Sequence, residues 1–587
     1  MKHAKTLIIA VTVLLGVCIW KLSMEANWRY LAANLIYQTH GINNGNMIFS
    51  KESGFYDDEF ELKIYAPTNE IYYTLDGSDP DRTSIKYEGA ISVQDASKNP
   101  NAYSMRTDVT TEFLHEELEK YSKEKYRAYY QTPDYLIDKC NVIKAVYYDK
   151  AGNCSEIEER VYFVDFDEKS GYENINVLSI ITDPENLFGY ENGIYVTGRT
   201  YDVFRAETDL EEFWAAPYWE HWSANYKNKG MDWERTANIQ VFDEGKDLVL
   251  SQNAGIRIQG GGSRGFLPKS LNIYAREEYG ADKMYYDFFD TGYYPKRVTL
   301  TTGGDDYYTK IKDRLVSELS AETNAITMNY EPYALFLNGE YWGFYYLTEK
   351  YDTQYVEEYF GVDKGGEAEN IIIVKNGLLE KGLEGDLEQY YTAIMEDIYS
   401  SNLEKNDEYE RICDLIDIDS CIDYFAVLGY AARCGDWPDS NFAMWRSRNI
   451  SEKPYEDGKW RWMVFDVNST ALDSSLISHD IIAQLRDSSR LFDKLCDNEN
   501  FRRAFAERLI EMSDTIFEKD YVSETITEYI ELMDEPMEKH YQRFFGTSND
   551  KFHEGVEEIR EFYNQRKPYI IESIRNNFGE EYLGEQQ

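Results

Sequence analysis

Residues 433–442 read RCGDWPDSNF and residues 459–470 read KWRWMVFDVNST, and these two stretches decide how the second half of the chain is interpreted. The first follows an apolar helical segment and precedes the strand pattern FAMWR, so its polar residues are predicted to form a loop. The second is predicted to be a strand that buries Trp462 and Val464 and carries Asp466 at its end.

The polar residues of these stretches have the types and spacing of a metal-assisted phosphoryl-transfer site. Asp436 lies five residues before Asn441, as in the catalytic loop of protein kinases, where the Asp accepts the hydroxyl proton and the Asn binds magnesium, although no His-Arg precedes it here. Asp466 matches the metal-binding Asp of kinases without the following Phe-Gly, and such oxygen ligands suit Mg²⁺. Each residue also has a structural interpretation, as a turn Asp, a turn cap or a strand-end residue.

Two upstream blocks could contact phosphate. Residues 260–265 read GGGSRG and lead into Lys269, so backbone N–H groups and a lysine could lie against an anion, but the stretch fits neither standard nucleotide motif and is equally typical of a tight hairpin. Residues 338–350 read NGEYWGFYYLTEK, which predicts a hairpin with Glu349 at the end of its second strand. Glu349 either pairs with Lys269, as the conserved Lys and Glu of kinases do, or solvates the strand end.

The 587-residue chain is too long for a single core and is predicted to contain several domains. Hydrophobic residues make up 43% and aromatic residues 15%, which excludes a disordered chain. Alternating strands are followed by a mixed strand and helix region, and then by a long helical region. The predicted boundaries are a signal peptide or signal-anchor at 1–24, a linker at 25–52, a β-sandwich module at 53–166 and a large α+β domain at 174–580.

The β-sandwich module is carried by residues 70–93, EIYYTLDGSDPDRTSIKYEGAISV. In this stretch Asp76-Gly77 forms a tight turn between strands. The stretch resembles the chitobiase/β-hexosaminidase C-terminal-type module, which implies a small all-β, immunoglobulin-like sandwich acting as a spacer or accessory unit. Carbohydrate contact remains open. Residues 100–133 are predicted to be a charged helical insertion in this module.

The order of motifs from Asn174 to Phe578 resembles the CotH family of atypical protein kinases, related to spore coat protein H. The blocks are Gly-Ser-Arg followed by Pro-Lys-Ser, a polar turn and helix, the Asn-Gly-Glu-Tyr hairpin, Asp-Trp-x-x-x-Asn, Trp-Arg-Trp-x-x-x-Asp and Arg-x-Phe-Tyr-x-x-Arg. The resemblance implies a kinase-like fold, with a mixed antiparallel-sheet lobe and a helical lobe, that binds ATP with Mg²⁺ and phosphorylates Ser or Thr of protein substrates.

The same resemblance implies roles for individual residues. Asp436 would be the catalytic Asp, Asn441 and Asp466 the metal ligands, and Lys269 the phosphate-contacting Lys with Glu349 as its partner. Arg264, in the Gly-Ser-Arg block, is also expected among the cofactor-binding residues.

Two departures from the family pattern keep other functions open. Asn468 replaces the second acid of the family's Trp-Asp-x-Asp motif, and Lys312-Asp313 replaces its Arg-Asn or Arg-Asp. A catalytically inactive surface or coat scaffold, or an adhesin, is therefore the alternative. A carbohydrate-active protein with paired acids is a third hypothesis, which no distinctive spacing supports.

Charge and the N-terminus bear on partners and compartment. A formal charge of −46 disfavours nucleic acid and favours a basic, Ser/Thr-containing protein substrate. The apolar run at 6–20 after Lys2 and Lys5 predicts export, with an uncleaved membrane anchor preferred because no A-x-A site follows. The protein is thus expected outside the cytoplasm, anchored or secreted. Cys140 and Cys154 are expected to be unpaired thiols, with a disulfide as the alternative.

Overall fold

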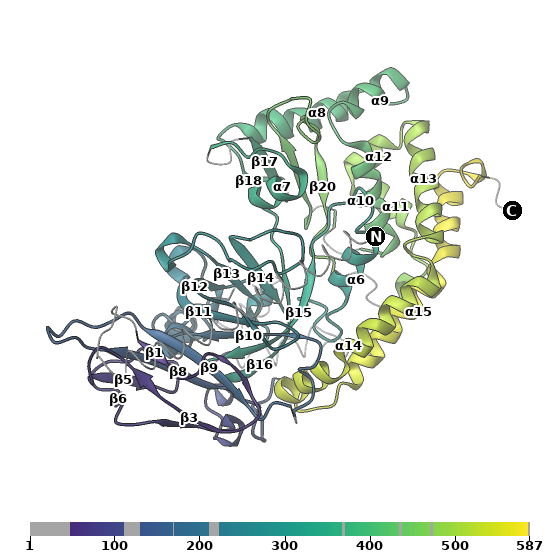
Figure 1. Cartoon of the computed structure of the whole chain (residues 1–587). Helices are drawn as coiled ribbons and strands as arrows, with labels where there is room; N and C mark the ends of the chain where they lie inside the picture. Colours follow the sequence, from purple (N-terminus) through teal and green to yellow (C-terminus); the bar gives the residue numbers. More distant parts are fainter. Residues whose placement is uncertain are drawn as a thin grey trace, which may run out of the picture. The chain divides into compact units, whose positions relative to one another are not determined.

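The computed structural model describes residues 47–110, 130–167, 169–209, 222–366, 370–433, 437–438, 440–469 and 474–584 (Figure 1). The chain divides into two compact units. The first comprises Met1–Ala96 and Cys140–Phe166, and the second comprises Ser97–Lys139 and Asp167–Gln587. The region predicted as an insertion in the β-sandwich therefore groups with the second unit, while most of its predicted helix lies outside the described residues.

The first unit is built from short strands. Its five-stranded sheet has the order β2 (Gly54–Tyr56), β9 (Glu158–Val164), β8 (Asn141–Tyr147), β5 (Ile71–Thr74) and β6 (Ile85–Lys86), and two further pairs are β3 (Phe60–Leu62) with β7 (Ile91–Val93) and β1 (Ile48–Phe49) with β4 (Ile64–Tyr65). Leu62, Ala145 and Tyr162 are fully buried in its core. Cys140 and Cys154 are both free thiols.

The second unit begins with a closed seven-stranded barrel. Around the barrel the strands follow the order β10 (Asn176–Ile181), β11 (Arg235–Phe242), β12 (Leu248–Ile258), β13 (Leu271–Tyr274), β14 (Arg297–Thr301), β16 (Glu340–Thr348) and β15 (Tyr330–Leu337). All neighbours are antiparallel except β10 and β15, whose parallel pairing closes the barrel. The predicted antiparallel pairing is thus found, and the β15–β16 hairpin turns at Asn338-Gly339 as predicted.

A second sheet supplies the other wall of the site. Its order is β18 (Leu378–Lys381), β17 (Ile371–Lys375), β19 (Ala443–Ser447) and β20 (Arg461–Met463), all antiparallel. Successive side chains point to opposite faces of a sheet. Accordingly Ile371 and Ile373 pack on α7 (Thr353–Phe360), whereas Ile372 and Val374 enter the large core shared with the helices.

The helices come mainly after the second sheet begins, as the three- and four-residue apolar spacing predicts (Figure 1). In chain order they are α3 (Pro184–Phe188), α4 (Gly198–Glu207), α6 (Lys312–Leu319), α7, the π-helix η10 (Leu387–Thr392), α8 (Ala393–Ser400), α9 (Asn406–Cys413), α10 (Ile418–Tyr430), α11 (Ile481–Ser488), α12 (Arg490–Leu495), α13 (Glu499–Asp514), α14 (Lys519–Phe545) and α15 (Asp550–Asn577). Short 3-10 turns are η1 (Ala96–Lys98), η2 (Tyr103–Met105), η5 (Asn225–Lys227), η6 (Met231–Trp233), η7 (Gly262–Gly265), η8 (Glu277–Tyr279), η11 (Ser474–Leu476) and η12 (Glu580–Tyr582).

No helix within the described ranges is both long enough and apolar enough to cross a membrane. The apolar run at 6–20, on which the predicted anchor depends, lies outside those ranges. The anchor therefore stays a prediction.

Helix α14 is joined to the barrel at a glycine of β16. Gly343 has φ +107°, and a Cβ atom there would lie 2.8 Å from a ring carbon of Phe544 and 2.9 Å from Nδ1 of His540. The backbone N–H of Phe344 donates to that same Nδ1 at 3.1 Å. Because only glycine permits so close an approach, this contact fixes the helical region against the barrel.

The loop between β14 and α6 is held from within by a buried acid. Asp306 accepts hydrogen bonds from the hydroxyl of Thr309 at 2.5 Å and from the backbone N–H of Lys312 at 3.0 Å. The ammonium of Lys310 donates to the carbonyl oxygen of Thr302 at 2.5 Å. These bonds set where α6 begins, and with it the position of Asp313 in its first turn.

Replacing Asp306 with alanine is expected to lower the free energy of unfolding by roughly 1–3 kcal/mol, because buried backbone and hydroxyl donors would lose their acceptor. The free energy of unfolding of this variant is measured by chemical denaturation. Glu322→Ala is the control, because Glu322 is an exposed acid in the turn after α6. Equal stability of the two variants would contradict this account of the loop.

Candidate active site

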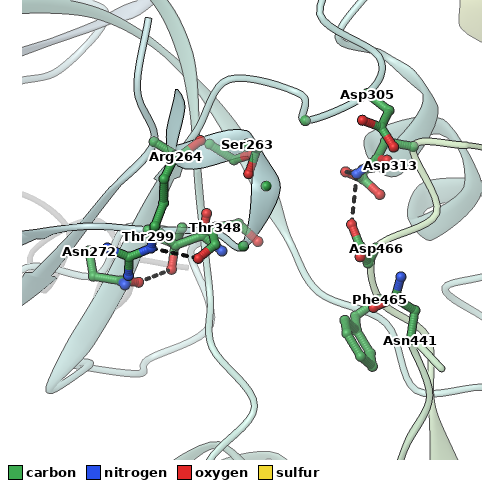
Figure 2. A pocket seen from close by; sticks show the side chains of 18 of the residues that line it. Ser263, Arg264, Asn272, Thr299, Asp305, Asp313, Thr348, Asn441, Phe465 and Asp466 are labelled. Atoms are coloured by element: carbon green, nitrogen blue, oxygen red, sulfur yellow. Dashed lines mark hydrogen bonds between the residues drawn. The ribbon is translucent and has the colours of Figure 1, made fainter. Parts of the chain in front are cut away.

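A cleft of about 1200 Å³ lies between the barrel and the second sheet. The barrel contributes the β12–β13 loop, with Gly260 and Arg264, and side chains of β13, β14 and the end of β16. The second sheet contributes the ends of β17 and β19 and the segment after β20. Figure 2 shows Arg264, Asn272 and Thr299 facing Asp313, Asp466 and Asn441 across this space.

Two carboxylates meet in the cleft with an amide between them. Asn468 donates through Nδ2 to Oδ1 of Asp466 at 2.8 Å and to Oδ2 of Asp313 at 3.4 Å, and the backbone N–H of Val467 donates to Oδ1 of Asp313 at 2.7 Å. Burial first, and then the Asp466 carboxylate, raise the pKa of Asp313 to about 7. Ionisation of Asp313 beside Asp466 in this cleft is therefore unfavourable.

The backbone at both predicted metal ligands is unusual. Asp466 has φ +56° and Asn441 has φ +53°, in the left-handed region that non-glycine residues rarely occupy. Such conformations concentrate at functional sites, where the surrounding structure holds them. Here Trp462, Val464 and Val467 are buried on either side of Asp466, as the strand pattern predicts for the first two.

Cations line the same cleft. Burial, followed by Lys375 and Arg297, lowers the pKa of Lys350 to about 8, and burial likewise lowers the pKa of Lys375. The ammonium of Lys375 lies 4.1 Å from the ring centroid of Phe465, the residue before Asp466. Arg297 approaches Asp352 at 3.5 Å. Within the described part of the chain, neither lysine has a carboxylate within ion-pair distance, so both present charge to a ligand.

Arg264 lines the cleft but uses most of its guanidinium to hold the glycine-rich loop. It donates through Nε to the carbonyl of Gly260 at 2.7 Å and through Nη1 to the carbonyls of Asn228 at 2.9 Å and Tyr226 at 3.2 Å. Burial lowers its pKa to about 10. Its main effect is therefore to shape the loop that faces the ligand.

Lys269 and Glu349, considered as a pair in the sequence, are not brought together. Lys269 is fully buried, its ammonium donates to the carbonyl of Arg264 at 2.8 Å and lies 3.7 Å from the ring centroid of Tyr226, and it does not line the cleft. Burial holds its pKa well below the usual range. The kinase-like pairing and the phosphate contact expected of Lys269 are therefore corrected, because aromatic packing holds this ammonium away from the ligand space.

Glu349 does line the cleft, but with other partners. Its carboxylate accepts from the backbone N–H of Asn329 at 2.8 Å, from the side-chain amide of Asn329 at 3.1 Å and from the hydroxyl of Tyr359. Burial raises its pKa to about 7. It therefore ties the end of β16 to α7, rather than solvating a strand end.

Asp436, the predicted catalytic residue, lies outside the described residues, so its role stays a prediction. The neighbouring Trp437 is described and is 2% exposed, and its indole N–H donates to the hydroxyl of Tyr424 at 2.9 Å. Asn441, further along the same loop, lines the cleft with Asp466.

The structure adds residues that the sequence did not single out as site residues: Asp313, Arg297, Lys350 and Lys375. For two of them the sequence contains a feature that could have identified them. Asp313 follows Lys312 in the helix block of the family pattern, and Lys375 ends the strand IIIVK directly before an Asn-Gly turn. Nothing in the local sequence sets Lys350 or Arg297 apart, because their common position depends on β14 and β16 being neighbours.

The donor set suits a hard cation beside phosphate. No group of three or more His, Cys, Asp or Glu side chains within the described ranges could hold a metal by itself. Two carboxylates and neighbouring amides are nevertheless what Mg²⁺ uses when substrate phosphates and water complete its shell. A cation bound beside Asp313 and Asp466 would relieve the repulsion between the two carboxylates, which contributes to the raised pKa of Asp313.

Two parts of the chain match known family models. Residues 256–570 match the family model described as CotH kinase protein, and residues 60–162 match the model described as Fn3 associated. The first match covers the glycine-rich loop, both acids and both cleft lysines. The second covers most of the strands of the first unit. No curated protein matches the chain.

The raised pKa of Asp313 makes cation binding depend on pH. A cation that needs the Asp313 carboxylate must compete with its proton below about pH 7, so thermal stabilisation by Mg²⁺ with ATP is expected to be larger at about pH 8 than at about pH 6. The melting temperature, measured with and without Mg²⁺ at both pH values, checks this expected difference.

Asp313→Asn is the matched control for that experiment. Without metal, the folded-state pKa of Asp313 exceeds its unfolded value of about 3.9, so stability is lost as pH rises between the two values. The variant should therefore be more stable than the wild type at about pH 8 without Mg²⁺. Its thermal stabilisation by Mg²⁺ with ATP should no longer differ between about pH 6 and about pH 8. A variant that keeps the full response would exclude Asp313 as its source.

Proposed function

Because the chain belongs to the CotH kinase protein family, whose model matches more than half of it, we propose that it is a protein kinase that transfers the γ-phosphate of ATP to Ser or Thr. Family membership implies a kinase-like fold and the use of ATP. The carrying observation is a single cleft lined by two carboxylates, Asp313 and Asp466, and by two lysines, Lys350 and Lys375, which have no carboxylate within ion-pair distance among the described residues.

The cleft residues have distinct roles in this proposal. Asp466 and Asn441 hold Mg²⁺, with Asp313 as a further acidic contact, while Asn468 orients the two carboxylates. When bound, Mg²⁺ would neutralise charge on the transferred phosphate. Lys375 and Lys350 attract the phosphate oxygens, because desolvated ammonium groups that lack an ion-paired carboxylate, as these two do among the described residues, gain most from an anion.

The remaining proposed roles belong to residues of two loops. Asp436 positions the acceptor hydroxyl and accepts its proton, as the Asp-x-x-x-x-Asn spacing suggests. The loop from Gly260 to Gly265 covers the phosphates with its backbone, and Arg264 keeps that loop in shape.

Substrate and compartment are part of the same proposal. The apolar N-terminal run supports an extracytoplasmic protein anchored in the membrane or secreted. The charge of −46 supports a basic protein substrate of the cell surface or spore coat rather than nucleic acid. The Fn3-associated unit would serve as an immunoglobulin-like accessory module.

One observation favours the inactive scaffold as a second candidate. Asn468 stands where the family pattern has a second acid, and its amide is already engaged with Asp466 and Asp313. A site with one acid fewer would bind metal more weakly. Nucleotide binding separates the candidates, since a scaffold with a decayed site gains no stability from ATP and Mg²⁺.

The direct test of the kinase uses two site variants. ATP with Mg²⁺ should raise the melting temperature of the fragment from about residue 47 onward, EDTA should abolish the shift, and Asp466→Asn should remove it. Asp436→Asn should retain binding but lose phosphoryl transfer from labelled ATP by at least about a hundredfold, because the positioned base is removed. Unchanged transfer in both variants would refute the proposal.

The lysines provide a sharper test of the cleft. Lys375→Met should weaken ATP binding by about tenfold, since it removes a desolvated cation facing the ligand. Lys269→Met should leave ATP affinity within about twofold, because that ammonium is sealed against Tyr226 and a carbonyl oxygen. Titration calorimetry measures both, and the reverse ranking would restore Lys269 as the phosphate contact.

A further inference from the structure

One buried arginine of the helical region contacts two stretches of backbone that are adjacent in sequence to site residues. Arg566, in α15, is the second arginine of the Arg-x-Phe-Tyr-x-x-Arg block, and no role proposed above uses it. Its side chain is fully buried. At the end of α10 it donates through Nε to the carbonyl oxygen of Tyr430 at 3.2 Å and through Nη2 to that of Gly429 at 3.4 Å. Through Nη1 it donates to the carbonyl oxygens of Leu476 at 3.2 Å, Ile477 at 2.6 Å and His479 at 2.9 Å.

The first stretch leads into the loop that carries Asn441. Helix α10 ends at Tyr430, and the carbonyl groups of a last helical turn have no partner further along their own helix. Arg566 supplies donors to these carbonyls, and its positive charge lies at the negative end of the helix dipole. Just beyond, Ala432 has φ +51°, so the chain leaves the helix through a left-handed turn. Arg566 thus holds the point from which the Asn441 loop departs.

The second stretch, residues 476–479, follows the segment that carries Asp466 and Asn468. It begins at the last residue of η11 and ends directly before Asp480, which caps α11 by accepting from the backbone N–H of Ala483 at 3.1 Å. Asp480 also accepts from the side-chain amide of Asn577, in α15, at 2.9 Å. Helix α15 therefore holds this stretch at more than one point, and Arg566 connects it in addition to α10.

A guanidinium group suits this double contact. Burial lowers the pKa of Arg566 to about 10, so the group remains charged near neutral pH. Its N–H donors lie in one rigid plane, and they reach carbonyl oxygens of both stretches at once. Two separate capping groups would satisfy the same carbonyls without fixing the distance between the stretches. Arg566 is not one of the residues that line the cleft, so any effect on a ligand passes through the backbone.

We propose that Arg566 is a positioning residue, which holds the loop carrying Asn441 and Asp436 at a fixed distance from the segment carrying Asp466 and Asn468. The inference deepens the proposed kinase function and rests on it for the effect on phosphoryl transfer. Catalysis of that reaction consists mainly of placing the acceptor, the metal and the phosphate, and a displacement of about 1 Å can lower the rate about a hundredfold. The rate of transfer therefore depends on a side chain that does not touch the ligand.

The kinetic test compares Arg566→Met with Arg508→Met in the full chain. Arg508 also holds α10, through hydrogen bonds to the Asp423 carboxylate at 2.6 and 3.1 Å, so its loss weakens the same helix away from its end. Phosphoryl transfer from labelled ATP is measured below the melting temperature of both variants. Arg566→Met should lower kcat about a hundredfold and leave KM for ATP within about threefold, whereas Arg508→Met should leave both within about threefold. A fall in kcat no larger than that of the control, or a KM that rises in step with it, overturns the proposal.

Amide hydrogen exchange, measured by mass spectrometry on the same proteins, makes the two proposals fail separately. Arg566→Met should speed exchange about tenfold in both residues 428–433 and residues 474–480, and Arg508→Met should speed it in neither. If the wild type transfers no phosphate, the kinase proposal fails and exchange alone decides: acceleration in both stretches supports positioning by Arg566, and acceleration in one or neither overturns it. Arg566→Lys, which keeps the charge but loses the planar fork, replaces Arg566→Met if the latter does not fold.

Discussion

The amide of Asn468, held between the carboxylates of Asp313 and Asp466, is the interaction on which the site depends. Asp313 belongs to α6, whose start is set by the β14–α6 loop, whereas Asp466 and Asn468 belong to the segment after β20. The amide thus joins these two segments at the point where the two carboxylates meet. Asn468 brings no charge of its own to this point but supplies a donor that holds the two acids together.

The cleft contains both carboxylates and lysines, and this combination determines which ligands it can bind. Asp313, whose pKa is raised, lines the same cleft as Lys350 and Lys375, whose pKa values are lowered, and burial is the leading cause in each case. A direct ion pair between a lysine and a carboxylate would have lowered the pKa of the acid and raised the pKa of the lysine. Among the described residues neither lysine forms an ion pair with a carboxylate, so a ligand that carries a cation and an anion together, as a metal–nucleotide does, would satisfy both kinds of group.

Local sequence patterns predicted the elements well but not their closure into a site. The β15–β16 hairpin and the strand before Asp466 follow from an Asn-Gly turn and alternating burial, which are properties of neighbouring residues. Closure of the barrel depends on the parallel pairing of Asn176 with Tyr333, which no local pattern reveals. The burial of Lys269 likewise depends on Tyr226, which is distant in sequence, so a lysine beside a glycine-rich loop could not be distinguished in advance from one that faces the ligand.

The contact of α14 with β16 at Gly343 has a mechanical consequence. The ring atoms of His540 and Phe544 leave no space for a side chain there, and Nδ1 of His540 is bonded to the strand backbone. Sliding of α14 along β16 would break that bond and collide with the strand. A widening of the cleft that slides α14 along β16 is therefore opposed at this point, so the helix and the strand are expected to move as one body.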